Sequence, residues 1–286
     1  MQEPPAASPP SYVVQTSPEL QRKLRQADQL KADIDQKRPL HPDLWATILK
    51  KSKVDWTYDS NAIEGSTLTR SDTFYLLEHG ITVQGKPLKD FLDARNHAEA
   101  VDLLYDVVRD QRPISAGLIK ELNALLLSGV RLTTAISEQG QRVQKPATPG
   151  AYKKLSNHVL QPDGTIHHYA EPLEVPLLMD ELVTWVDENI GSSHPALVGA
   201  VAHYNMVRIH PFDDGNGRGA RILMNLLLMR GGFLPAIIRF EERERYIETI
   251  VQADKGQLNP FVSFMLDALI ETQEGVLADL SRVGDS

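Results

Sequence analysis

Apolar residues recur at helical spacing along most of the chain. Leu118, Leu122 and Leu125 form one such stripe, because residues three and four apart share a face of an α-helix. The pattern predicts a mainly α-helical protein. The expected helices cover residues 18–37, 42–64, 70–79, 87–110, 114–128, 174–190, 195–209, 217–230, 241–253 and 260–280.

Local signals mark the start of the first helix. Residues 1–17 are rich in proline and poor in apolar side chains, which predicts a flexible arm. Ser17, Pro18 and Glu19 then provide a capping hydroxyl, a proline suited to the first turn and an acid near the positive helix end. We therefore expect the folded part of the chain to begin at this point.

One segment departs from helical periodicity. Two short runs, 152–160 and 165–169, flank Pro162-Asp163-Gly164. Proline presets one dihedral angle of a turn and glycine accepts a positive φ, so the natural interpretation is a β-hairpin. Strands do not alternate with helices along the chain, and a doubly wound sheet that binds a dinucleotide is therefore not expected.

Composition narrows the classes of partner. The chain has 286 residues, a formal net charge of −8 and no cysteine. Disulfides, thiolate metal sites and a cysteine nucleophile are therefore excluded. An acidic chain lacks the basic surface that non-specific nucleic-acid binding needs. Because no apolar run is long enough for a bilayer and no basic region leads into one, we expect no membrane partner, no secretory signal and a cytoplasmic location.

The densest group of polar residues lies between two apolar helical stretches, from His210 to Arg221. Its glycines, in the run Gly215-Asn216-Gly217, allow successive backbone N–H groups to point outward at the N-terminus of the next helix. Such an array of donors readily binds phosphate. Loops of this kind between packed helices often carry function.

The charged residues of this segment suit a polyphosphate and its metal ion. Arg218 and Arg221 share a helical face in the first turns, where a cation is unfavourable unless an anion is near. Asp214 offers a hard oxygen ligand for Mg²⁺. His210 ends the preceding helix and titrates near neutrality, as a general base should. Phe212 is expected to turn inward and hold the loop on the core.

Each of these residues also has an ordinary structural interpretation: a charge partner at a helix end, a glycine turn, a solvated basic face. Their occurrence together favours a functional site. The segment resembles the signature of the Fic (Fic/Doc) family, His-x-Phe-x-Asp/Glu-Gly-Asn-Gly-Arg-x-x-Arg. The matching positions are His210, Phe212, Asp214, Gly215, Asn216, Gly217, Arg218 and Arg221.

The resemblance implies a Fic-type helical bundle with a small β-hairpin flap, and transfer of AMP from ATP to a Ser, Thr or Tyr hydroxyl of another protein. The intact Gly-Asn-Gly-Arg run favours AMP transfer over phosphate transfer. The resemblance implies that His210 accepts a proton and that Asp214 binds Mg²⁺. It implies that phosphate is bound by the backbone of Gly215, Asn216 and Gly217 and by the side chains of Asn216 and Arg218. Arg221 would pair with the γ-phosphate.

A second motif lies near the end of the second expected helix. Ser60 and Glu64 are four residues apart on one helical face, and Gly65 follows. Taken alone, this is a solvated helix end with a glycine cap. Beside the first motif it resembles the family's inhibitory sequence, Ser/Thr-x-x-x-Glu-Gly/Asn. The resemblance implies that Glu64 pairs with Arg221 and occupies the place of the γ-phosphate.

The resemblance also implies a division of the chain: an arm at 1–17, a helical region with the inhibitory motif at 18–69, a Fic core at 70–275 and a tail at 276–286. The hairpin at 152–169 would be the flap that binds the target as an added strand. Tyr246 has two interpretations, packing on adenine or packing in the core. Homodimerisation and self-modification stay open.

Other functions are compatible with the same residues. The site could remove AMP from a modified protein, with Glu64 positioning the attacking water. It could also bind nucleotide as a regulator without turnover, although the complete residue set speaks against this. A fused DNA-binding regulator is a further possibility, but no basic recognition helix is evident in residues 1–68, and no further domain is expected after Ser286.

Overall fold

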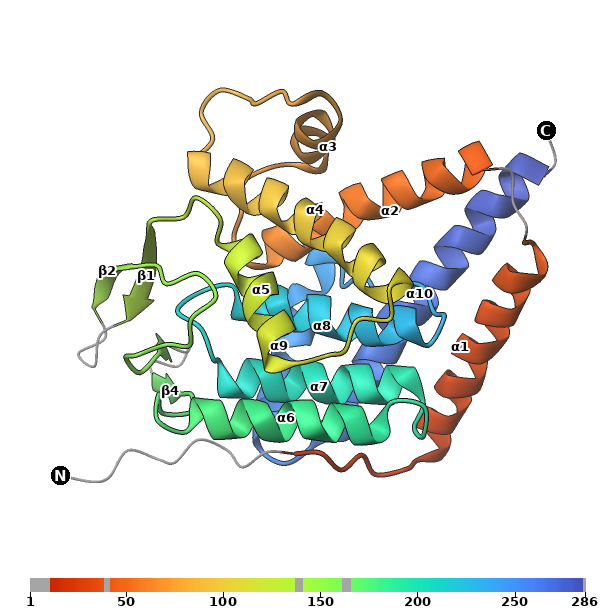
Figure 1. The fold of residues 1–286 in the computed structure, drawn as a ribbon. Coiled ribbons are helices and arrows are strands. Elements are labelled where there is room, and N and C mark those ends of the chain that lie inside the picture. Colours follow the sequence, from red (N-terminus) through yellow and green to blue (C-terminus); the bar gives the residue numbers. More distant parts are fainter. Residues whose placement is uncertain (1–10, 39–41, 137–140, 161–165, 285–286) are drawn as a thin grey trace.

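The computed structural model describes residues 11–38, 42–136, 141–160 and 166–284. These residues form a helical molecule with two small β-hairpins at one end (Figure 1). The mainly helical prediction is confirmed, and each expected helix is present with ends shifted by a few residues at most. The helices are α1 Pro18–Gln36, α2 Pro42–Ile63, α3 Arg70–His79, α4 Leu88–Arg109, α5 Ala116–Leu126, α6 Val175–Asn189, α7 Pro195–Ile209, α8 Asn216–Arg230, α9 Arg243–Asp254 and α10 Leu258–Gly284, with a short 3₁₀ helix at Phe240–Glu242.

The two hairpins are antiparallel pairs. In the expected one, β3 (His158–Leu160) pairs with β4 (Ile166–His168), and its turn at residues 161–165 lies outside the described residues. The other pairs β1 (Leu132–Ile136) with β2 (Arg142–Pro146) and was not expected. Its first strand is rich in β-branched and aliphatic residues, a strand signal that the neighbouring helical patterns obscured.

Helix α8 lies at the centre of the molecule. It contributes Leu228 to an apolar cluster with α7, α9 and α10, Leu223 to one with α5, α6 and α7, and Leu226 to one with α4 and α5. Figure 1 shows α7 running beside α8, with α6 against α7 and with α4 and α5 on the opposite side. The loop between α7 and α8 is therefore fixed at both ends by the densest packing in the fold.

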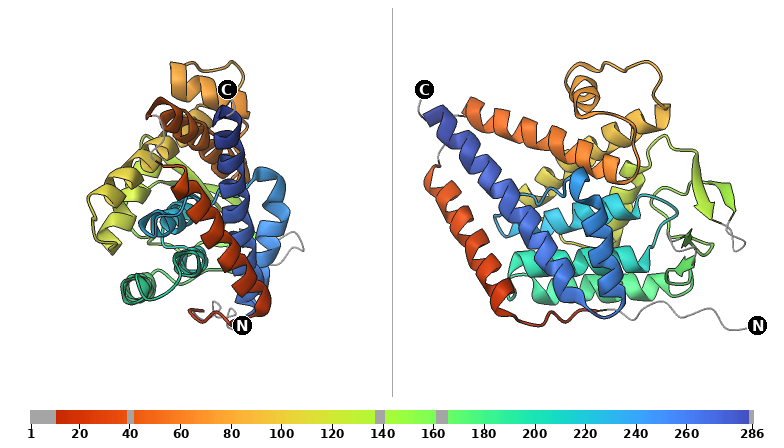
Figure 2. Two further views of the ribbon diagram at one scale, coloured as in Figure 1. Left: turned by 90° about the vertical axis from the view of Figure 1, so that its right-hand side faces the viewer. Right: turned by 180° about the vertical axis from the view of Figure 1, so that it is seen from behind.

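Helix α1 lies along α10, which joins the N-terminal region to the rest of the molecule (Figure 2). The buried ammonium group of Lys23 reaches the hydroxyl of Ser263 at 2.7 Å and the carboxylate of Asp267 at 2.6 Å. Helix α10 ends at Gly284, beyond the expected helix end at 280 and within the tail expected at 276–286. Val276 and Leu280 are 7% and 5% exposed and pack with residues of α1 and α2, so this apolar contact extends the helix.

The expected flexible arm is partly docked. Residues 1–10 lie outside the described part of the chain, but Ser11 exchanges two hydrogen bonds with the side chain of Asn205 on α7. The ring of Tyr12 stacks on Trp185 of α6, with centroids 5.3 Å apart. Among the helices that the structure describes, none combines the length and apolar character needed to cross a membrane.

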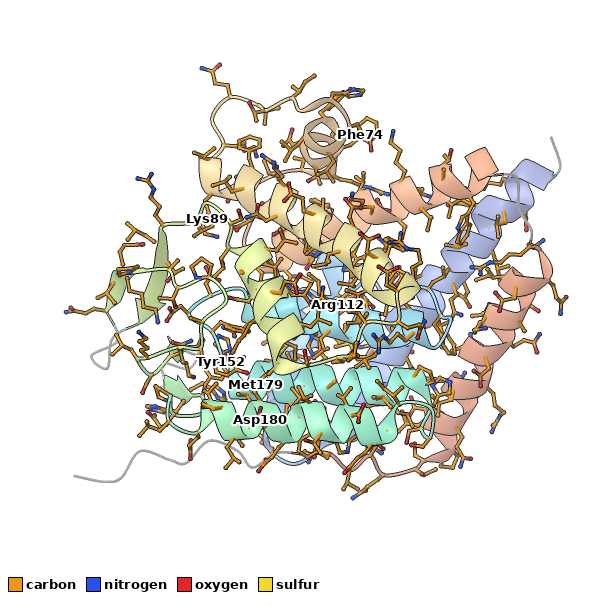
Figure 3. The ribbon with its side chains drawn as sticks, viewed as in Figure 1. Phe74, Lys89, Arg112, Tyr152, Met179 and Asp180 are labelled. Carbon is orange, nitrogen blue, oxygen red and sulfur yellow. The ribbon has the colours of Figure 1, made fainter. Side chains whose placement is uncertain are left out.

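Helix α3 shows how local sequence sets helix ends. Thr69 accepts a hydrogen bond from the backbone N–H of Asp72, whose carboxylate accepts one from the backbone of Thr69 in return. This capping box begins the helix, and Gly80 ends it with a φ of 65°. Phe74 on this helix points away from the core and is 39% exposed (Figure 3).

Candidate active site

The signature loop, residues 210–221, turns sharply between α7 and α8. His210 ends α7 in the left-handed region with a φ of 51°, which is unusual for a residue other than glycine. Gly215 precedes α8 with a φ of 77°. Phe212 is fully buried, as expected, and its ring packs in the cluster under α6 and α7. The turn between α7 and α8 is thus attached to the core through the buried ring of Phe212.

Asn216 closes this turn. Its side-chain oxygen accepts from the backbone N–H of Phe212 at 2.9 Å, and its side-chain nitrogen donates to the carbonyl of Phe212 at 2.9 Å. The residue is 2% exposed. Its amide therefore holds the loop, whereas the resemblance implied a side-chain contact to phosphate. Its backbone N–H belongs to the first turn of α8, where donors have no intrahelical partner.

Two further asparagines hold the loop from outside and were not found in the sequence analysis. Asn123 on α5 donates to the carbonyl of Asp214 at 2.9 Å, and Asn157 donates to the carbonyl of Phe212 at 2.8 Å. Asn123 lies on the apolar stripe of α5 and is 2% exposed. A polar residue on an apolar helical stripe was the available signal.

His210 is held in one orientation. Its Nδ1 lies 3.2 Å from the carbonyl of Val207, so we assign the proton to Nδ1 and the lone pair to Nε2. Tyr169, directly after β4, stacks on the imidazole with centroids 3.8 Å apart and planes 15° apart. The ring is thereby fixed from two sides.

The surroundings of His210 keep it neutral. Burial, and after it the positive charge of Lys153, lower its pKa to about 3, although the hydrogen bond to Val207 works in the opposite direction. Lys153 is itself 2% exposed, and burial lowers its pKa to about 8. The expectation that His210 titrates near neutrality is therefore wrong for this resting structure, because burial keeps the imidazole neutral throughout the physiological range. The neutral ring still carries the lone pair on Nε2 with which a general base accepts a proton.

Arg218 is directed into the protein. It is 2% exposed, and its Nη1 lies 2.7 Å from Oδ1 of Asp93 on α4. A second carboxylate, that of Asp214, lies 3.7 Å from its Nη2. Burial alone would lower the pKa of Arg218, but these two carboxylates raise it above its usual value. The sequence analysis missed Asp93, which lies on the buried face of α4 among further polar residues, Asp90, Asn96 and His97.

Arg221 is bound by the second motif. Its Nε donates to the hydroxyl of Ser60 at 3.0 Å, and its Nη2 donates to the carbonyl of Ser60 at 2.8 Å and to Oε1 of Glu64 at 2.7 Å. The expected partners are thus brought together across 157 residues of chain. Burial raises the pKa of the Glu64 carboxyl, but the charge and hydrogen bond of Arg221, together with the charges of Arg218 and Arg243, outweigh it, so that the pKa lies below its ordinary value.

The carboxylate of Glu64 also lies directly on the signature loop. A Cβ atom placed on Gly217 would be 2.4 Å from Oε1 of Glu64. The absence of a side chain at this position therefore lets the carboxylate approach the first turn of α8. An anion at a helix N-terminus is favourable, so the loop, together with Arg221, binds an internal anion.

Tyr246 lies in the core, which was the second of its two interpretations. It is 2% exposed, packs near Phe261 and Phe264, and its hydroxyl lies 3.1 Å from Nε2 of His203. So little exposure leaves its ring no open face for adenine. Its hydroxyl instead adds to the polar surroundings of Arg221, whose pKa it helps to raise.

The residues fit a magnesium ion only if phosphate supplies further ligands. Asp214 is the one carboxylate of the loop with appreciable exposure, at 32%, and its Oδ1 accepts from the N–H of Gly215 at 2.6 Å. No group of three or more His, Asp or Glu side chains in the described part of the chain could hold a metal by itself. One carboxylate shared with phosphates is the usual arrangement for Mg²⁺.

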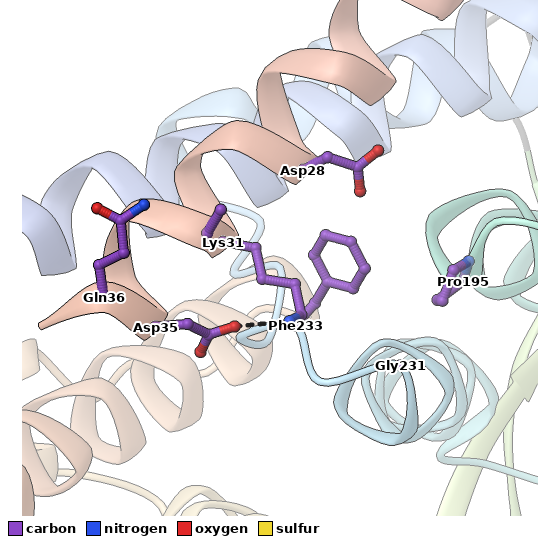
Figure 4. A pocket seen from close by; sticks show the side chains of 8 residues that line it. Asp28, Lys31, Asp35, Gln36, Pro195, Gly231 and Phe233 are labelled. Carbon is purple, nitrogen blue, oxygen red and sulfur yellow. Dashed lines mark hydrogen bonds and ion pairs between the residues drawn. The ribbon is translucent and has the colours of Figure 1, made fainter. Parts of the chain in front are cut away.

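A cavity elsewhere in the molecule contains none of the signature residues. It has a volume of about 690 Å³ and is lined by residues of α1, Pro195 at the start of α7 and Phe233 after α8 (Figure 4). Lys31 and Asp35 form an ion pair of 2.7 Å along its rim. None of the polar groups that line it belongs to the signature, and all come from α1: Asp28, Lys31, Asp35 and Gln36.

Comparison with known proteins identifies the family. The Fic/DOC family matches residues 113–228. Protein adenylyltransferase Fic of Nematostella vectensis is 33% identical over 267 residues, which are 90% of this chain and 58% of that protein. The protein of the same name from Drosophila erecta is 33% identical over 225 residues, 78% of this chain and 41% of that protein. The chain thus spans about half the length of these relatives.

Solved structures show the same architecture. A Fic domain containing signaling protein from Bacteroides thetaiotaomicron has a TM-score of 0.77 at 28% identity, covering 92% of this chain and 97% of that one. Fic-1 from C. elegans has a TM-score of 0.75 at 26% identity, covering 93% and 73%. Sequence match, fold and signature loop together show that this chain contains a Fic/DOC family domain, matched at residues 113–228.

Proposed function

We propose that this chain is a protein adenylyltransferase that transfers AMP from ATP to a Ser, Thr or Tyr hydroxyl of another protein. The observation that carries the proposal is the neutral imidazole of His210, held beside a glycine-containing helix N-terminus that already binds an anion. The name and activity of the relatives, protein adenylyltransferase, agree with it.

The proposed reaction uses this chain's own groups for positioning and proton transfer. The target hydroxyl oxygen attacks the α-phosphorus of ATP, the bond to the β-phosphate oxygen breaks and pyrophosphate leaves. Nε2 of His210 accepts the hydroxyl proton. The backbone N–H groups at residues 215–217 stabilise the phosphate oxygens, and Arg221 pairs with the γ-phosphate.

Magnesium belongs to this proposal as a partner of ATP. Asp214 would hold it together with phosphate oxygens, where it would neutralise charge on the triphosphate. Arg218 contacts Asp214 from the buried side of the loop, because its guanidinium lies between Asp93 and Asp214. In this role Arg218 orients Asp214 and supplies positive potential.

We further propose that the resting chain is restrained by Glu64. Its carboxylate lies against Gly217 and pairs with Arg221, so it takes the position proposed for the γ-phosphate. The target would bind to the flap, residues 152–169, where a strand added beside β3 or β4 is recognised largely through its backbone. A homodimer, self-modification and a cytoplasmic location stay predictions.

The test is incubation with α-labelled ATP and Mg²⁺, with cell lysate as the source of acceptors. Glu64→Gly should transfer about 10- to 100-fold more label than the unchanged chain, because a charge-assisted hydrogen bond is worth about 1.5–3 kcal/mol. Adding His210→Ala should reduce transfer by about 10²–10⁴-fold. Glu244→Gly, at an exposed position in the first turn of α9, is the matched control and should change nothing.

The other outcomes identify the alternatives. Equal labelling by the unchanged chain and Glu64→Gly would refute the restraint. If every variant binds ATP but none transfers AMP, the proposed transferase activity is refuted, and a nucleotide-binding regulator is favoured. Release of AMP from the labelled acceptor by the unchanged chain but not by Glu64→Gly would instead assign the chain to AMP removal, with Glu64 positioning water.

A further inference from the structure

The closest ring contact at the candidate site joins the hairpin to the imidazole. The centroids of Tyr169 and His210 are 3.8 Å apart, and their planes are nearly parallel, at 15°. The stacked pair Tyr12–Trp185, by comparison, has centroids 5.3 Å apart. The phenol ring of Tyr169 therefore covers one face of the imidazole.

Tyr169 is itself held in place on several sides. The ring of His167 meets it edge-on with centroids 4.7 Å apart, and the ammonium nitrogen of Lys153 lies 5.9 Å from its centroid. Ala170, which follows it, is 1% exposed. Burial raises the pKa of the phenol, so the ring is neutral. The stack thus involves two uncharged rings with little freedom to move.

This arrangement restricts rotation of the imidazole ring, which would misplace the proton-accepting nitrogen of a general base. An imidazole can rotate about its Cβ–Cγ bond, which would swing Nε2 away from a bound hydroxyl. The contact from Nδ1 to the carbonyl of Val207 restricts that rotation at one edge of the ring, and Tyr169 blocks it across one face. A displacement of about 1 Å at a reacting group can cost a factor of about 10² in rate.

Charged groups of both signs lie around the imidazole. The positive charges of Lys153, in the segment before β3, and of Lys145, on β2, disfavour a proton on His210, and Asp213 pairs with Lys145 at 2.7 Å. Removing the phenol ring would let water reach the imidazole without removing these charges. Tyr169 therefore controls how far water reaches the imidazole of His210.

We propose that Tyr169 is a positioning residue for the general base: by stacking, it fixes the plane of the His210 imidazole, excludes water from that face and couples the hairpin β3–β4 to the base. The proposal deepens the proposed AMP transfer and rests on it for its kinetic consequence. The stack itself can be tested without any transfer activity.

The first experiment follows the histidine ring signals by NMR as a function of pH. The variants are Tyr169→Phe, which keeps an aromatic ring, and Tyr169→Leu, which does not. Tyr75→Leu, at a 45% exposed position on α3, is the matched control. The signal of His210 is assigned by its loss in His210→Ala, and thermal melts establish that each variant is folded.

We expect His210 to stay neutral between pH 5 and 8 in the unchanged chain, in Tyr169→Phe and in Tyr75→Leu. In Tyr169→Leu, hydration should raise its pKa by at least about one unit toward the ordinary value of 6.5. The upfield ring-current shift of its carbon-bound protons should also disappear. An unchanged titration and unchanged shifts in Tyr169→Leu would overturn the proposal.

The second experiment measures transfer in the Glu64→Gly background. Tyr169→Leu should lower kcat by about 10- to 100-fold with the Kd for ATP unchanged, and Tyr169→Phe should restore kcat. A loss that Tyr169→Phe does not restore would refute stacking as the cause. If no variant transfers AMP, the proposed function fails, while the NMR result still decides whether Tyr169 positions His210.

Discussion

The two arginines of the signature loop face acids of different character. Asp93, the partner of Arg218, has a side chain 7% exposed, whereas that of Glu64, the partner of Arg221, is 42% exposed. Separating a buried pair leaves a charge without solvent, but a half-exposed carboxylate can regain water as it leaves. Glu64 is therefore the acid that an incoming triphosphate can displace, and Asp93 is a permanent partner.

The pair with Arg221 should make stability depend on pH. The pKa of Glu64 in the folded protein lies below its ordinary value of 4.5. The pair therefore stabilises the fold above that value, and the stabilisation is lost as pH falls through the lower, folded-state pKa. We expect the free energy of unfolding of the unchanged chain to exceed that of Glu64→Gln at pH 7 by up to about 1 kcal/mol, since the pair is partly exposed.

Urea unfolding of both chains between pH 7 and pH 3 measures this difference. It should shrink toward zero in the acid range. Glu244→Gln, at an exposed position in the first turn of α9, should show no such trend. A difference between the chains that stays constant across the whole range would contradict the assignment of the charge to this pair.

Among the elements, α2 carries the restraint because its last turn reaches the start of α8. Ser60 and Glu64 contact Arg221 there, and the guanidinium of Arg243 donates to the carbonyl of Ile63 from α9 at 2.8 Å. These contacts fix the end of α2 on the site. Motion of α2 away from α8 is thus the movement that would free the signature loop.

The connection that follows α2 depends on the cap of α3. Thr69→Ala removes the hydroxyl that accepts from the backbone of Asp72. We expect α3 to lose about 1 kcal/mol of stability, the usual cost of an N-cap, visible as faster hydrogen exchange of its amides. Ser71→Ala, at an exposed position of the same helix, should leave the exchange unchanged. Equal exchange in both variants would refute the capping role.

Helix bounds were largely predictable because helix ends obey local rules. Thr69 and Gly80 act within four residues of the ends that they set. The strands β1 and β2 were missed because a strand is stabilised by a partner that is separate in sequence. Leu132 pairs with Pro146, fourteen positions further along the chain, and a run of residues such as 132–136 has no periodicity long enough to identify alone.

Across the whole molecule, the site depends on the packing under α7 and α8. Phe212 is fully buried and packs in the apolar cluster formed by α5, α6, α7 and α8. The ring centroids of Phe212 and Tyr152 are 5.6 Å apart. The loop above Phe212 contains little apolar surface of its own. Phe212 is therefore the apolar anchor of the loop, and Asn123, Asn157 and Asn216 add polar contacts to its backbone.

Phe212→Ala should destabilise the protein by about 3–5 kcal/mol, the usual cost of emptying a buried aromatic site. Affinity for ATP should fall as well, because the loop loses its anchor. Phe74→Ala, at a position 39% exposed on α3, should change stability by less than about 0.5 kcal/mol. Urea unfolding measures the stability of both variants. Similar losses of stability in the two would contradict the anchoring role of Phe212.

The helices, the β3–β4 hairpin and the residues of the signature loop followed from the sequence, because each depends on neighbours within a few positions. The tertiary structure alone decided the use of those residues. It directed Arg218 to Asp93, turned the amide of Asn216 back on Phe212 and placed Tyr169 on His210. Two of these contacts, Arg218 with Asp93 and Tyr169 with His210, join elements far apart in the chain, and only the packing around α7 and α8 brings such groups within a few ångströms. The third joins residues four apart, but the conformation of the loop decides which way the amide of Asn216 turns.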